Sequence, residues 1–298
     1  MTSDLEPPAW LRDALTHAPD PRETDADGVR VRWYRWGERG GPGVLLIHGG
    51  LCHAHWWDHI APLLTGCDVV AADLSGNGDS TYTGGPYGAH RWAREMLAVM
   101  DDAGLSRPIV VGHSMGGHIA LALGANFPDR IGGVITVDTR FNDNPYGTRE
   151  KPSSIYSSLE EGISRFNPVY GSVGLPVDPV LWRHIAETSL SSTEGGWRWK
   201  RDDRFEFEHV RVRELLPDLI PPLAIIRTEF GLVTTEMAAE MRGLVAGPST
   251  VVEIPAASHN PHLEQPVAFV ATLRTLIGSW FPAVREPVID SYSTTETK

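Results

Sequence analysis

The sequence is poor in cysteine and has no long apolar run. Only two cysteines, Cys52 and Cys67, occur among 298 residues, whereas secreted disulfide scaffolds carry more. No apolar run approaches the roughly 20 residues that span a bilayer. Residues 1–20 are acidic and contain prolines, and they lack the apolar stretch of a signal peptide. These absences predict a soluble, cytoplasmic protein.

Basic residues are also scarce relative to acidic ones. There are 26 Lys and Arg against 38 Asp and Glu, a formal net charge of −12. Such a surface repels phosphate backbones and anionic lipid, so we expect neither nucleic acid nor a membrane as partner. The length suits one large domain, or one core with an inserted subdomain. A small-molecule substrate is the partner we expect, and the sequence leaves a homodimer open.

Short apolar runs separated by helical patterns organise the chain. Residues 29–36 alternate apolar and polar side chains, which predicts an early antiparallel strand. The runs that predict buried strands are 43–47, 69–72, 109–111, 134–137, 223–226 and 250–254. The helical patterns are 54–64, 88–103, 115–126, 235–245 and 267–280. This alternation predicts an α/β fold, with a mostly parallel sheet covered by helices on both faces and a site at the carboxyl ends of its strands.

Residues 141–216 interrupt this alternation. The segment has no buried-strand run and contains Trp182, Trp197, Trp199 and several prolines. Long structureless loops are rare in compact domains, so we expect a helical cap or lid over 141–216. The α/β core would then comprise residues 1–140 and 217–298. The polar tail over 285–298 is expected to fray.

The sequence G-H-S-M-G at residues 112–116 directly follows an apolar run and precedes a helical one. This is the strand–turn–helix context of a nucleophile elbow, with Ser114 as the nucleophile. Glycine is needed there because a Cβ would clash with neighbouring backbone. A serine in a glycine-rich turn by chance is the alternative, and the flanking elements disfavour it.

The glycine-rich turn after residues 43–47 reads His48-Gly49-Gly50-Leu51. The backbone N–H of Gly50, with Leu51 as a fallback, and the N–H of Met115 are candidates for an oxyanion hole. The alternative is a tight turn that merely requires glycine.

His259 lies in the loop between the last strand run and the last long helix. From there it can reach Ser114, which makes it the candidate general base, although a surface histidine is the usual fate of any one of twelve. We expect His113 and His118 to pack beside the elbow, and His262 is a candidate to support the base.

His53 and His55 form an H-x-H pair. A metal site would need a third ligand, and no nearby residue offers the spacing, so we expect no metal. We also expect no cofactor, because no G-x-G-x-x-G motif opens a helix after the first strand and no Walker sequence occurs.

Together these motifs resemble the α/β-hydrolase superfamily over about residues 29–281, apart from the cap. The motifs are HGG at 48–50, DLSGNGDS at 73–80, GHSMGG at 112–117 and SHNPHLEQP at 258–266. The resemblance implies a serine–histidine–acid triad, an eight-stranded sheet and a helical lid. It argues against haloalkane dehalogenases and epoxide hydrolases, which place aspartate where this chain has Ser114.

The sequence departs from the family at the triad acid. The family's usual turn reads TEFGLV at 228–233, and the expected carboxylate position falls near Gly231 or Leu232, neither of which can serve. Asp138, after the run 134–137, and Glu229, slightly early in the turn, are the replacements, and Asp202 and Asp203 are remote candidates. We choose Asp138 over Glu229, against the alternative that this aspartate only forms a turn.

The residues therefore predict a serine hydrolase of the carboxylesterase or lactonase type, acting on a small apolar ester or lactone through an acyl-enzyme. Two alternatives stay open: a carbon–carbon bond hydrolase, lyase or cofactor-free oxygenase on the same triad, and a non-catalytic ligand-binding protein. In the cap, residues 197–201 (WRWKR) are candidates to bind an apolar or anionic acyl group. We favour the alternative that these tryptophans form the cap's own core.

Overall fold

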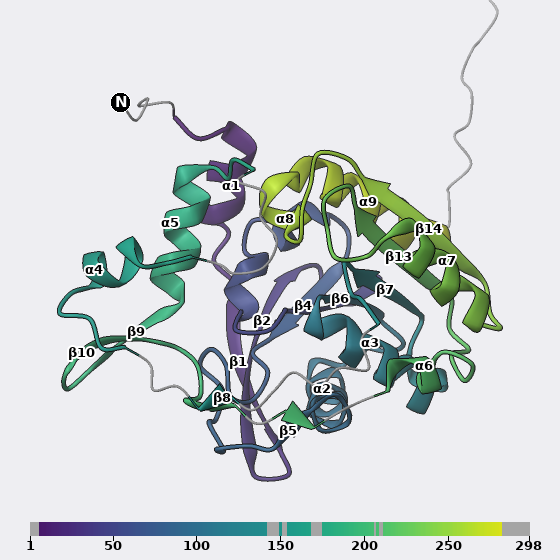
Figure 1. Ribbon diagram of the computed structural model, residues 1–298, viewed down its shortest axis with the longest axis horizontal. Helices are drawn as coiled ribbons and strands as arrows, with labels where there is room; N and C mark the ends of the chain where they lie inside the picture. Colours follow the sequence, from purple (N-terminus) through teal and green to yellow (C-terminus); the bar gives the residue numbers. More distant parts are fainter. Residues whose placement is uncertain are drawn as a thin grey trace, which may run out of the picture.

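The computed structural model describes residues 6–141, 149–150, 154–167, 175–205, 207–208 and 211–281. An eight-stranded sheet forms its centre (Figure 1), which confirms the predicted α/β fold. In sheet order, the strands are β1 (Asp20–Ala26), β2 (Val29–Gly37), β4 (Asp68–Ala72), β3 (Gly43–Ile47), β6 (Ile109–His113), β7 (Gly133–Val137), β13 (Leu223–Thr228) and β14 (Ser249–Ile254). The pairings β1–β2 and β2–β4 are antiparallel, and those from β4 to β14 are parallel.

Burial explains why most strands could be predicted from the sequence and one could not. Every residue of β3, β4, β6 and β7 is buried, as continuous apolar runs require. In contrast, β1 is polar and mostly exposed, and it was not predicted. It pairs with β2 across a hairpin whose turn residues, Asp27 and Gly28, both have positive φ. An Asp-Gly pair is a strong hairpin signal, so this dipeptide could have identified the strand.

Two apolar layers enclose the sheet. One face is covered by α2 (Ala89–Ala103), α3 (Met115–Asn126) and α7 (Thr235–Leu244), and the other by α9 (Pro266–Trp280) with residues 54–64.

The helix predicted over 54–64 is wrong. That segment forms two short 3₁₀ turns, η1 (Ala54–Trp57) and η2 (Ala61–Leu63). Pro62 has no N–H, and its ring would clash with the preceding turn of an α-helix.

The described part of 141–216 is mixed rather than purely helical. It contains α4 (Leu159–Ser164), α5 (Pro179–Thr188) and α6 (Val212–Leu215), together with a hairpin of β9 (Leu190–Thr193) and β10 (Gly196–Trp199). Short strands β8 (Arg149–Glu150), β11 (Arg204–Phe205) and β12 (Phe207–Glu208) complete it, β12 pairing with β5 (Tyr87–Gly88). The hairpin residues are mostly half-buried, so their sequence shows no continuous apolar run that would predict these strands. The tail over 285–298 lies outside the described residues.

The N-terminal helix packs against this inserted region. Helix α1 (Ala9–Thr16) places Leu11 in one apolar cluster with Leu181 and Ile185 of α5, and the two helices lie beside one another in Figure 1. Within the described ranges, no helix has both the length and the apolar character needed to cross a bilayer.

Candidate active site

The backbone at Ser114 makes a sharp turn between β6 and α3. Ser114 has φ 50° and ψ −116°, a conformation that non-glycine residues rarely adopt. A Cβ at Gly112 would lie 2.2 Å from the carbonyl oxygen of Gly116, and one at Gly116 would lie 2.4 Å from that of Ile47. The glycines of the motif are therefore required by close backbone approach, and the turn presents a partly exposed serine at the carboxyl edge of the sheet.

Ser114, His259 and Asp138 are brought together into one hydrogen-bonded chain. The Ser114 Oγ lies 3.0 Å from His259 Nε2, and His259 Nδ1 lies 2.7 Å from Asp138 Oδ2. Asp138 is fully buried and His259 is 4% exposed. Because Nδ1–H donates to the carboxylate, Nε2 of the neutral ring keeps a lone pair that can accept the serine proton.

The carboxylate of Asp138 is also held by the turn that usually supplies the acid. It accepts the backbone N–H of Leu232 at 2.9 Å and that of Val233 at 3.0 Å. A Cβ at Gly231 would lie 2.5 Å from Asp138 Oδ1 and 2.0 Å from Thr228 Oγ1. The missing side chain at residue 231 therefore makes room for a carboxylate that arrives from β7.

The other proposed acids are engaged elsewhere. Glu229 accepts the backbone N–H of Ala256 at 2.8 Å. Asp202 accepts the Tyr87 hydroxyl at 2.6 Å, and Asp203 pairs with Arg198 at 3.3 Å. Among the four candidates, Asp138 is the one that contacts the His259 ring.

The turn after β3 lies against the elbow. A Cβ at Gly50 would be 3.8 Å from Met115 Sδ, and Leu51 has φ 63°. Met115 is the first residue of α3, so its N–H has no acceptor within the helix. His48, at the start of this turn, accepts the N–H of Leu74 at 3.1 Å. Burial lowers the pKa of His48 to about 4, so this ring is a neutral structural group.

Two further histidines contact the backbone that carries His259. His113 Nε2 lies 2.8 Å from the carbonyl oxygen of His259, and His59 Nε2 lies 2.6 Å from that of His262. The sequence predicted that His113 packs near the elbow but did not identify its partner. His59 was not considered, and no local sequence signal marks it, because its partner is 203 residues away.

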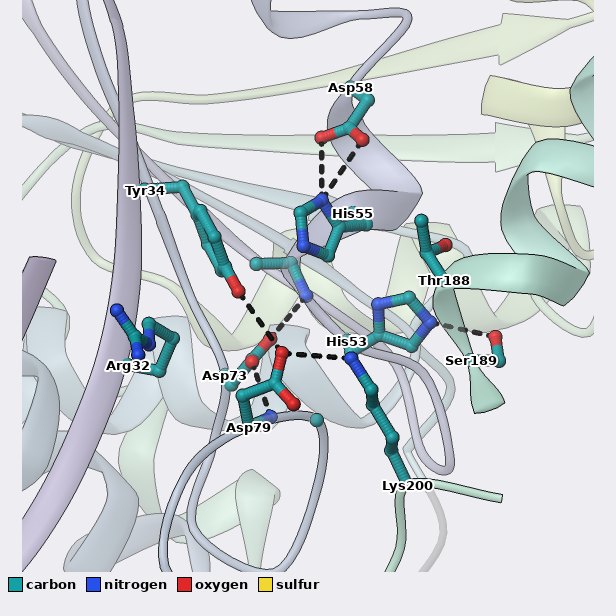
Figure 2. A network of polar contacts seen from close by, with 12 residues as sticks. Arg32, Tyr34, His53, His55, Asp58, Asp73, Asp79, Thr188, Ser189 and Lys200 are labelled. Carbon is teal, nitrogen blue, oxygen red and sulfur yellow. Dashed lines mark hydrogen bonds and ion pairs between the residues drawn. The ribbon is translucent and has the colours of Figure 1, made fainter. Parts of the chain in front are cut away.

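A separate polar network joins the core to the inserted segment (Figure 2). Lys200 lies 2.9 Å from Asp79, and the ring of His53 donates from Nε2 to Ser189 Oγ at 2.7 Å. Asp73 accepts the backbone N–H groups of Ala54 and Asp79, and burial raises its pKa to about 6. The DLSGNGDS motif thus serves the turns beside the site rather than the triad.

His53 and His55 have structural partners. The Asp58 carboxylate oxygen Oδ2 lies 3.0 Å from His55 Nδ1 and 2.7 Å from Nε2 of His184, a residue of α5. Over the described ranges, no group of three or more His, Cys, Asp or Glu side chains is arranged to hold a metal ion.

The aromatic and basic residues of β10 and its flank mainly contact one another and the core. Trp199 Nε1 donates to the Tyr156 hydroxyl at 3.0 Å, and Arg198 donates to the carbonyl of Arg201 at 3.2 Å. With Lys200 paired to Asp79, this pattern fits the packing interpretation of residues 197–201 better than an acyl-binding one.

Comparison with known proteins agrees with the fold. A model of the Alpha/beta hydrolase family matches residues 44–272. The esterase Rv0045c of Mycobacterium tuberculosis is 25% identical over 277 residues, 89% of this chain and 92% of the esterase. Lipase LipV of the same organism is 28% identical over 169 residues, 56% of this chain. Because the match covers 64% of LipV, the chain spans less than two thirds of that relative.

Solved structures resemble the chain over most of its length. The structure of E-2-(acetamidomethylene)succinate hydrolase has a TM-score of 0.74 and 19% identity, covering 89% of this chain and all of that one. The structure of Rv0045c has a TM-score of 0.70 at 20% identity, covering 93% and 99% of the two chains. At this identity the likeness shows the fold. The chain belongs to the Alpha/beta hydrolase family.

Proposed function

We propose that the protein is a serine hydrolase that cleaves a carboxylic ester or lactone through an acyl-enzyme. The observation that carries the proposal is the continuous hydrogen-bonded chain from Ser114 through His259 to Asp138. The serine is accessible, whereas the base and acid are buried. This is the arrangement that nucleophilic acyl transfer requires.

The geometry supports a two-step reaction. Ser114 Oγ attacks the carbonyl carbon while His259 Nε2 takes its proton, and Asp138 stabilises the imidazolium. The C–O bond to the leaving group then breaks, and His259 returns the proton to the departing oxygen. Water adds to the acyl-enzyme by the same sequence of proton transfers, which releases the acid and restores Ser114.

The N–H groups of Gly50 and Met115 are the proposed donors to the oxyanion. They lie on neighbouring turns, and Met115 begins a helix whose dipole favours negative charge. We propose a small, apolar substrate, because aromatic rings connect η1, which follows the turn after β3, to the inserted segment. Trp56 packs on Phe166, with ring centroids 6.3 Å apart, and Phe166 packs on Trp182 at 5.0 Å.

The test combines a serine-reactive phosphonate, intact-protein mass spectrometry and a panel of p-nitrophenyl esters and lactones of graded chain length. Ser114→Ala should fold normally, lose phosphonate labelling and lose about 10⁶-fold in kcat. The control is Ser164→Ala, because this exposed hydroxyl on α4 bonds only locally to Glu161. Hydrolysis that persists in Ser114→Ala, or labelling of another residue, would refute the proposal. Labelling of Ser114 without turnover of any ester or lactone would point to another reaction on the same triad.

A further inference from the structure

The loop that carries His259 is held by histidine rings from other parts of the chain. His113 Nε2 donates to the carbonyl oxygen of His259 at 2.8 Å, and His59 Nε2 donates to that of His262 at 2.6 Å. His113 is the last residue of β6, and His59 lies between η1 and η2. The backbone of the loop is thereby fixed at two points three residues apart.

These rings are neutral, which fixes how they bond. Burial and the repulsion of His259 lower the pKa of His113 to about 3, and burial lowers that of His59 to about 4. A neutral imidazole has one N–H, and a carbonyl oxygen can only accept. The proton must therefore reside on Nε2 in both rings, since each Nε2 faces a carbonyl.

His113 connects the two halves of the candidate site. Its backbone continues directly into Ser114, and its side chain bonds the backbone of His259. The two rings also pack together, with centroids 4.8 Å apart. The His113 side chain is therefore a direct contact between the strand that leads into Ser114 and the loop that carries His259.

We propose that His113 is a positioning residue that sets the separation of Ser114 Oγ and His259 Nε2 by holding the His259 carbonyl through a neutral Nε2–H. The inference rests on the proposed function, since it concerns the same nucleophile and base. His59 supports the far end of the loop in the same way.

The absence of charge on His113 is part of this role. His259 becomes an imidazolium when it takes the serine proton, and a second positive ring in contact with it would oppose that step. Burial keeps His113 uncharged across the pH range in which a histidine base works. The ring also packs against His262, at a centroid distance of 4.7 Å, and burial lowers the pKa of that histidine too.

The test compares two variants of His113 with one control variant of His118. His113→Phe keeps a planar ring but removes the donor, whereas His113→Gln places an amide N–H near the position of Nε2. His118 offers a matched control: it is also buried, and it donates from Nε2 to the carbonyl of Arg140 at 3.1 Å rather than to the loop that carries His259. The readouts are the rate of Ser114 phosphonylation, kcat and KM on a hydrolysed ester, and the melting temperature.

His113→Phe should lower both the phosphonylation rate and kcat by about 100-fold while KM stays unchanged, because a base displaced by about 1 Å loses that much. His113→Gln should recover most of this loss, and His118→Phe should match wild type in rate despite a similar fall in melting temperature. A folded His113→Phe that labels and turns over like wild type would overturn the positioning role alone. So would an equal loss in His118→Phe. A wild-type chain that is never labelled at Ser114 would overturn the proposed function and this inference together.

Discussion

The carboxylate of Asp138 occupies space that a side chain at residue 231 would fill. Gly231 leaves that space open, and the N–H groups of Leu232 and Val233 then bind the carboxylate. The positive φ of Asp138, 43°, is a strained conformation for a residue with a side chain. Strain of this kind persists only where surrounding contacts enforce it, and here three donors do so.

A pair of isosteric substitutions tests this assignment. Asp138→Asn should lower kcat about 10⁴-fold, because the amide favours the wrong tautomer of His259. Glu229→Gln is the control and should change kcat little, since Glu229 only accepts the exposed N–H of Ala256. Steady-state kinetics on the same ester measure both. A large loss in Glu229→Gln with little in Asp138→Asn would contradict the assignment.

Individual elements differ in how firmly they join the core. Helix α5 is attached through Asp58, a buried carboxylate that binds His55 of the core and His184 of the helix. Burial alone would raise the pKa of Asp58, but the hydrogen bonds from His184 and His55 outweigh it and lower that pKa. The same helix also forms an exposed ion pair between Arg183 and Glu160.

Asp58→Asn should therefore loosen α5. Removing a charged, buried hydrogen-bond acceptor costs about 2 kcal/mol, and amide hydrogen exchange in residues 179–188 should accelerate while α9 exchanges as in wild type. Arg183→Gln serves as the control on the same helix. Its partners are exposed, so it should leave the exchange unchanged. Equal acceleration in the two variants would show that Asp58 is not the attachment.

For the whole molecule, buried histidines predict how stability varies with pH. Burial lowers the pKa of His48, His53, His59, His113, His118 and His262. Below about pH 6.5 these histidines are protonated in the unfolded chain but stay neutral in the folded protein. Lowering the pH therefore favours unfolding. Asp73 and His55 act in the opposite direction, because their pKa values are raised in the folded state.

The free energy of unfolding should be greatest above about pH 6.5 and should fall as the pH approaches 5. Each buried histidine whose folded pKa is about 4 or lower contributes a loss of about 1 kcal/mol per pH unit over that range. Urea denaturation at a series of pH values measures the slope. A free energy of unfolding that stays constant or increases as the pH is lowered from about 7.5 to about 5 would contradict this expectation.

Some features were predictable because they depend on neighbours along the chain. The apolar runs predicted six strands of the sheet, and the alternation over residues 29–36 predicted a seventh. The GHSMG motif located Ser114 because strand, turn and helix follow one another directly. The polar strand β1 was missed, since its stability comes from pairing with β2 rather than from its own composition. The segment 54–64 was wrongly predicted as a helix. Its apolar residues are spaced as in a helix, but Pro62 prevents a continuous α-helix there.

The sequence by itself determined the buried strands, the sharp turn at Ser114 and the loop that carries His259, because each depends on periodicity or on a short motif. Only the tertiary structure decided which carboxylate meets His259, why residue 231 is glycine, and which histidine ring bonds the backbone of the loop that carries His259. These contacts join residues far apart in the chain: Asp138 and Leu232 are 94 positions apart, and Ser114 and His259 are 145 apart. Parallel strands bring such residues to one edge of a sheet, and the side chains that meet there are set by packing rather than by sequence spacing.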